Sequence, residues 1–228
     1  MNFTKPRKSL FILILIATNF LPLYFYATGG WTVFMFFYLY WLETVILSFY
    51  TSLKIIYASG YTANEAEPTL IKKIITAIKF FIARFLLLCF YLMFLVAFIG
   101  FIGEDKEAML KSLLAVVFRD ETFNIAIAGF ILSHGFEFLF NFLLTNENKK
   151  MRADGYTLFF DARIIVIHVS IVLSAFAITA FSDNHIAGHS VGSYLALTIF
   201  IVIKMIVDIF HLTSQNNQNF KMNIHNKY

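Results

Sequence analysis

The chain has 228 residues, of which 59% are hydrophobic, 18% aromatic and only 14% charged, with a net charge of +4. A soluble domain carries about 25% charged residues and about 45–50% apolar ones, so this composition excludes an ordinary soluble domain. High hydrophobicity also excludes a disordered chain, and the single cysteine, Cys89, excludes a disulfide scaffold. The composition therefore indicates a protein that crosses a membrane several times.

Six apolar stretches are long enough to span the bilayer, because a hydrocarbon core of about 30 Å takes about 20 helical residues. The alternating pattern of a membrane β-barrel is missing, so helices are expected. The sequence predicts an all-α fold, a single domain over residues 1–228 built as a bundle of six transmembrane helices. The predicted spans cover approximately residues 9–28, 31–54, 76–102, 122–145, 160–182 and 191–213.

The first span follows Lys5, Arg7 and Lys8, which is also how a signal peptide begins. Its apolar run is too long for a signal peptide, so we predict a retained span, with a local kink at Pro22. Between the third and fourth spans, residues 104–119 mix acidic and aliphatic side chains and predict a short helix at the outer interface.

The basic residues predict the orientation, because cytoplasmic loops of membrane proteins are enriched in Lys and Arg. With the N-terminus inside, thirteen of the 18 lie on the cytoplasmic side and three on the opposite side, and both termini are cytoplasmic. These cations stand at the ends of apolar runs instead of forming an exposed basic stripe, which argues against nucleic acid as a partner. The expected location is a bacterial or archaeal cytoplasmic membrane, with lipid as the partner and a homo-oligomer left open.

Several ionisable residues lie within the spans, where each charge costs about 2.5–3.5 kcal/mol near the centre of a helix. At about 1.5 Å per residue, most of them fall between the midplane and the cytoplasmic third of the bilayer. We therefore predict that they meet in one internal site. The residues are Glu43, Arg84, His134, Glu137, His168, Lys204, Asp208 and, near an inner end, His211.

Helical spacing supports this convergence. Lys204, Asp208 and His211 are four and three residues apart and share a face of the last span, and His134 and Glu137 share a face of the fourth. Arg163 points elsewhere and is interpreted as an interfacial anchor, with contact to an anionic headgroup or substrate as the alternative.

Three uses of such a site remain open. In the first, His134, His168, Asp208 and His211, with Glu43, bind a divalent or transition metal ion, although Lys204 and Arg84 would repel it. In the second, the site belongs to a proton-coupled or anion-transport pathway. In the third, the charges form a purely structural network, Lys204 with Asp208 and Arg84 with Glu43 or Glu137. An enzyme needs access to one face, a transporter access to both, and a structural network neither.

Three segments also carry a family resemblance. They are Tyr40-Trp41-Leu42-Glu43, His134-Gly135-Phe136 and Lys204-x-x-x-Asp208-x-x-His211. Together they resemble an uncharacterised family of prokaryotic polytopic membrane proteins, a domain of unknown function marked by Tyr-Trp-x-Glu in the second span and Lys-x-x-x-Asp in the last. The resemblance covers nearly the whole chain, except that Glu137 does not match the pattern. It implies a bundle of about six helices and supplies no activity.

Overall fold

A computed structural model of the chain describes residues 20, 22–28, 31–61, 66–97, 119–156, 162–181, 185–186 and 189–207. These ranges are helical apart from loops and two short antiparallel strands, β1 (His185–Ile186) and β2 (His189–Ser190). The long helices are α2 (Val33–Tyr57), α3 (Leu70–Leu95), α5 (Glu121–Phe136), α6 (Ala162–Ala180) and the Val191–Val207 helix. The π-helix η2 (Glu137–Leu143) continues α5, and the 3₁₀ turns η3 (Glu147–Lys149) and η4 (Ala153–Tyr156) follow it.

Three helices in these ranges have the length and apolarity needed to cross a membrane: α2, α3, and α5 together with η2. They correspond to the second, third and fourth predicted spans. The third begins at Leu70, six residues before the predicted start. Of the first predicted span, Phe20 and residues 22–27 are helical within the described ranges. Helix α6 and the Val191–Val207 helix lie within the fifth and sixth predicted spans. The count of six spans and the side of each terminus stay predictions, and residues 104–118 lie outside the described ranges.

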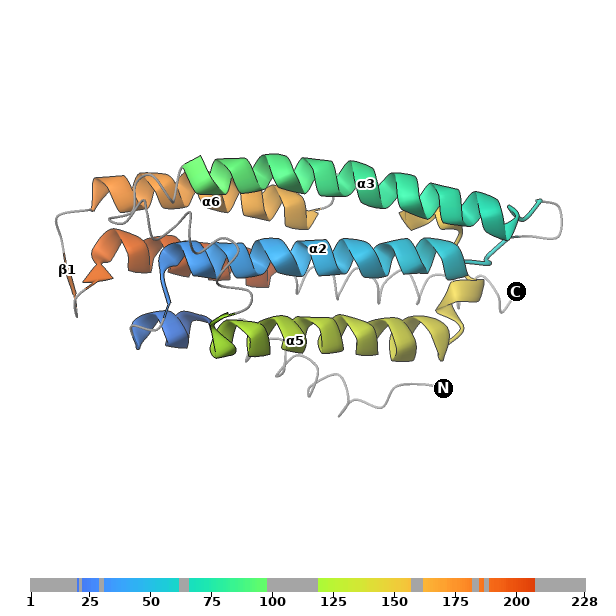
Figure 1. Ribbon diagram of the computed structural model, residues 1–228, viewed down its shortest axis with the longest axis horizontal. Coiled ribbons are helices and arrows are strands. Elements are labelled where there is room, and N and C mark those ends of the chain that lie inside the picture. The colour runs from blue at the N-terminus through green and yellow to red at the C-terminus, as the bar shows by residue number, and fades with distance from the viewer. Residues whose placement is uncertain are drawn as a thin grey trace, which may run out of the picture.

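Helix α2 lies at the centre of the bundle, between α3 and α5 (Figure 1), and packs against α3, α5 and α6. It begins at Thr32, whose hydroxyl oxygen accepts a hydrogen bond from the backbone nitrogen of Met35 at 3.2 Å. Asp120 caps α5 in the same way through the nitrogen of Phe123. Such caps satisfy amide groups that a helix start leaves without partners.

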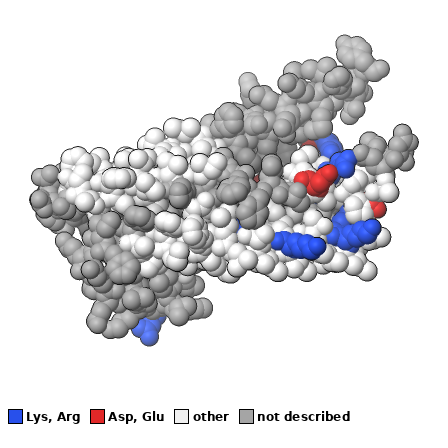
Figure 2. Space-filling view, turned by 90° about the horizontal axis from the view of Figure 1, so that it is seen from above, with Lys and Arg blue, Asp and Glu red and all other residues white. Residues whose placement is uncertain are grey.

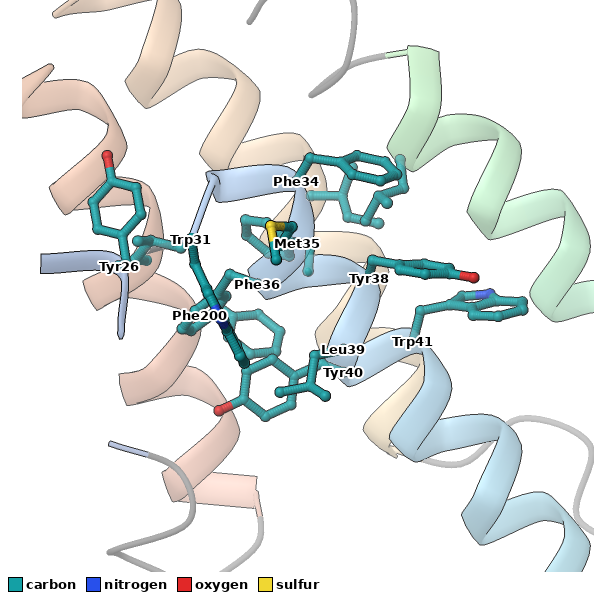
Figure 3. Close-up of a cluster of buried hydrophobic side chains, with 14 of the residues drawn as sticks. Tyr26, Trp31, Phe34, Met35, Phe36, Tyr38, Leu39, Tyr40, Trp41 and Phe200 are labelled. Carbon is teal, nitrogen blue, oxygen red and sulfur yellow. The ribbon is translucent and has the colours of Figure 1, made fainter. Parts of the chain in front are cut away.

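The core around α2 is aromatic. Figure 3 shows this cluster, in which Phe36, Tyr40 and Phe200 are at most 1% exposed. The indole nitrogen of Trp41 donates a hydrogen bond to the carbonyl oxygen of Leu88 at 2.7 Å and so ties α2 to α3 within the apolar interior. Burial of this much ring surface stabilises the central position of α2.

The exterior of α3 is apolar, as expected for a helix that faces lipid. The side chains of Ile71, Leu86 and Met93 are 69%, 65% and 59% exposed. The described charged residues visible in Figure 2 gather mainly toward one end, where α2 ends and α3 begins. A long uncharged belt with charge concentrated at an end fits a membrane-spanning bundle.

The loops at this charged end are tied together. The backbone nitrogens of Ser59 and Gly60 donate to the carbonyl oxygens of Asn148 and Met151, at 2.7 and 3.0 Å. The ammonium group of Lys73 reaches back to the carbonyl oxygen of Ala58 at 2.7 Å. These bonds hold the ends of α2, α3 and η2 in a fixed relation.

Candidate functional site: a charged cluster between three helices

Five ionisable side chains form a continuous row inside the bundle, which we call the charged cluster. Two come from α2, one from α5, one from η2 and one from the Val191–Val207 helix. Each contacts the next through a nitrogen and a carboxylate oxygen 3.1–3.6 Å apart, and each is between 11% and 23% exposed. In order, the charged cluster is Lys54, Glu137, His134, Glu43 and Lys204.

The contact between Lys204 and Glu43 joins two helices that are far apart in the sequence. The ammonium nitrogen of Lys204 lies 3.3 Å from Oε2 of Glu43 and 3.5 Å from Oε1. The same nitrogen lies 4.9 Å from the centre of the Tyr40 ring, a cation–π contact that also favours the charged amine. The structure thus gives Lys204 a partner on α2. The pairing of Lys204 with Asp208 stays a prediction, because Asp208 lies outside the described residues.

His134 lies between two carboxylates. Its Nε2 is 3.6 Å from Oε1 of Glu43, and its Nδ1 is 3.6 Å from Oε2 of Glu137. An ionised carboxylate only accepts hydrogen bonds, while a neutral imidazole has one nitrogen that donates and one that accepts. Both 3.6 Å contacts are longer than hydrogen bonds. Hydrogen bonds on both sides of the ring would require one additional proton, carried by the imidazole or by one of the carboxyl groups.

Lys54 completes the row and was not placed in the predicted site. Its ammonium nitrogen lies 3.1 Å from Oε1 of Glu137. The signal in the sequence was available, because Lys54 follows Glu43 by eleven residues, close to three full helical turns, so both project from the same face of α2. We had assigned Lys54 to the cytoplasmic end for its charge alone.

The backbone changes where the charged cluster crosses from α5 to η2. The α-helix ends at Phe136, and a π-helical stretch begins at Glu137. π-Helical turns widen a helix locally and are frequent at functional sites. Just before this change, the hydroxyl of Tyr50 donates to the carbonyl oxygen of Ile131 at 3.0 Å, and a Cβ at Gly135 would lie 2.9 Å from that hydroxyl oxygen.

Tyr156 stands beyond the charged cluster, outside the three candidate spans. Its ring packs at right angles against Phe142, with ring centres 5.8 Å apart. Burial raises the pKa of Tyr156 above its ordinary value of 10.0, and the negative charges of Glu147 and Glu137 raise it further. The phenol is therefore a neutral hydrogen-bonding group at physiological pH.

Of the other predicted site residues, the structure describes the side chain of Arg84. Arg84 is 3% exposed on α3 and lies against the ring of Phe80, 5.6 Å from its centre. Arg163 and His168 lie on α6, with side chains outside the described part, and Asp208 and His211 lie wholly outside it. Among the side chains that the structure describes, no three from His, Cys, Asp and Glu form a group suited to hold a metal ion.

The fold and the cluster together define a class, a helical bundle with helices long and apolar enough to cross a membrane and with ionisable groups packed between them. The chain belongs to a family of unknown function, DUF6498, whose pattern matches residues 2–225. This finding confirms the resemblance seen in the sequence. No curated protein and no solved structure matches the chain.

Proposed function

We propose that the chain is a multi-pass protein of a bacterial or archaeal cytoplasmic membrane whose charged cluster reversibly binds a small ligand, and that this ligand is a proton. The observation that carries the proposal is the position of His134, with a carboxylate oxygen 3.6 Å from each ring nitrogen. Imidazole is the side chain whose charge changes near neutral pH. A proton held between two glutamates is therefore exchangeable under physiological conditions.

The described groups that face His134 are Glu43 and Glu137, with Lys204 and Lys54 behind them and the Tyr50 ring 6.5 Å away. Each glutamate has a lysine on one side and the imidazole on the other. A proton gained or lost at His134 therefore changes the balance of charge along the row, and we propose the proton itself as the ligand.

A metal ion fits the described groups less well. The carboxylates of Glu43 and Glu137 that would bind it are each in contact with a lysine ammonium group, at 3.3 and 3.1 Å. Cations so close oppose a divalent ion. The predicted metal set of His134, His168, Asp208 and His211 depends on side chains outside the described part and is kept as an alternative.

Nitrogen-15 NMR of the histidine rings, in full-length protein in lipid bilayers, tests the proposal. The signal of His134 is assigned by its loss in His134→Gln, and Glu43→Gln and Glu137→Gln each remove one facing carboxylate. We expect the pH at which the His134 ring changes protonation to differ from wild type in both glutamine variants, because each removes one charged partner. Glu147→Gln, whose carboxylate pairs with Lys150 outside the cluster, serves as the matched control.

Two results would count against proton binding. One is a neutral His134 ring in wild type with both glutamates ionised, as judged by their carboxylate infrared bands, across the whole range from pH 5 to 8. The other is a His134 titration that does not respond to either glutamine substitution. Either result favours the purely structural network that the sequence left open, in which the charges only hold the helices together.

A further inference from the structure

The two directions along α2 from the charged cluster differ in packing. Toward the start of the helix, Tyr40, Leu39 and Phe36 are 1%, 0% and 0% exposed. Toward its end, the next residues on the side of Glu43 are Leu47 and Tyr50, and both are only half-buried. The surroundings of the charged cluster are therefore closed on one side and looser on the other.

Four rings from three helices close the side of the charged cluster that lies toward the start of α2. We call them the aromatic plug: Phe36, Tyr40, Phe130 and Phe200. The ring centre of Tyr40 lies 4.6 Å from that of Phe200, 5.0 Å from that of Phe36 and 6.1 Å from that of Phe130. Figure 3 shows Tyr40 directly beside Phe200. Interiors packed at this density have no room for a file of water molecules.

The charged cluster opens in the opposite direction. The most exposed side chain of the row is Glu137 at 23%, on the side of His134 that leads to Lys54 at 16%, whereas Glu43 and Lys204 on the other side are 15% and 12% exposed. Glu137 and Lys54 lie near the end of the bundle where α2 ends, and polar loops follow, including the half-buried side chain of Tyr156. A row of ionisable groups within 3.1–3.6 Å of each other gives a proton a path to that end.

We infer that the charged cluster exchanges its ligand with one membrane face only, the face at which α2 ends, which is the predicted cytoplasmic face. This inference builds on the proposed function, since it concerns the access to the same site. It makes the chain a protein that senses or acts on a proton from one compartment. Transport across the membrane would need a second opening through the aromatic plug.

Cysteine accessibility tests the inference in full-length protein in sealed membrane vesicles. Cys89, the single native cysteine, is first replaced by alanine. Leu47→Cys then reports the space between Glu43 and Lys54, and Phe36→Cys, eleven residues earlier on the same helical face, reports the aromatic plug. The exposed residues Lys149 and Arg119, at opposite ends of the α5–η2 helix, become cysteines that mark the two membrane faces.

A membrane-impermeant thiol reagent of small size is added to either side. We expect Leu47→Cys to react only from the side that labels Lys149→Cys, and Phe36→Cys to react from neither side. Reaction of Leu47→Cys from the Arg119 side, or of Phe36→Cys from either side, would overturn one-sided access. Absence of reaction at Leu47→Cys from both sides would overturn it too, because the cluster would then be sealed.

The folded state of each variant is checked by size-exclusion chromatography in detergent, and Leu47→Ala shows whether the smaller side chain alone disturbs the bundle. Proton binding at His134 is measured separately by NMR. A cluster that binds a proton but reacts from both faces refutes one-sided access alone, whereas a His134 that never changes protonation refutes the proposed function.

Discussion

Replacing Glu43 by glutamine removes the carboxylate that pairs with both Lys204 and His134. Loss of one partner from a buried ion pair costs about 3–5 kcal/mol, because the remaining charge is left in a poorly solvated site. Glu43 and Lys204 retain 15% and 12% exposure, so partial solvation reduces the expected cost to about 2–4 kcal/mol. For a chain of this size, about 2–4 °C of melting temperature corresponds to each kcal/mol, so the expected loss is on the order of 10 °C.

The assay is thermal unfolding in detergent, and a double variant makes it specific. The double variant Glu43→Gln with Lys204→Met removes both charges. We therefore expect its loss of melting temperature to be much smaller than the sum of the losses in the two single variants, with a coupling free energy of about 1–3 kcal/mol. Glu147→Gln removes half of the exposed pair with Lys150 and should cost less than about 1 kcal/mol. An unchanged melting temperature in Glu43→Gln, or strictly additive single effects, would refute the pairing of α2 with the Val191–Val207 helix.

Three further predictions concern packing and ionisation. Gly192→Ala should lower the melting temperature, because the added Cβ would clash with the carbonyl oxygen of Ala177 on α6. Gly129→Ala, with open space around the added Cβ, should not lower it. Gly135→Ala should also lower it, and Tyr50→Phe in the same chain should recover part of the loss by removing the hydroxyl that the Cβ would meet. In an alkaline absorbance titration compared with Tyr156→Phe, Tyr156 should stay neutral above pH 10 in the folded protein. In the unfolded chain the same phenol ionises near pH 10. The contribution of Tyr156 to the free energy of unfolding is therefore full below pH 10 and falls above it.

The composition and hydropathy of the chain were sufficient to predict the helical class and the positions of three helices. Long apolar runs decide helix length in lipid, because the bilayer thickness sets how many residues must be apolar. The boundaries were less accurate. Helix α3 begins at Leu70, six residues before the predicted start at residue 76. Basic residues such as Lys72 and Lys73 are compatible with a helix, so the helix extends beyond the apolar run that was used to predict its start.

The free-energy cost of charges in an apolar bilayer made one convergence predictable, since charges within spanning helices need partners. It is the convergence of Glu43, His134, Glu137 and Lys204. Which residue pairs with which was not predictable, because contacts between helices depend on how they rotate and tilt against each other. Lys204 lies four residues before Asp208, so local spacing favoured that pair. The structure places a carboxylate oxygen of Glu43 3.3 Å from the ammonium nitrogen of Lys204. Lys54 was missed because its charge was read only as a topology signal.

The most direct test of the central claim is a measurement of the geometry and protonation of His134 in wild-type protein in bilayers. Solid-state NMR can report the distance from each ring nitrogen to the carboxyl carbons of Glu43 and Glu137, together with the number of ring protons. We predict one short distance from each nitrogen, to Glu43 on one side and Glu137 on the other, with an additional proton shared among the three groups at neutral pH. A ring that lies near only one glutamate, or a neutral ring between two ionised carboxylates, would contradict the account.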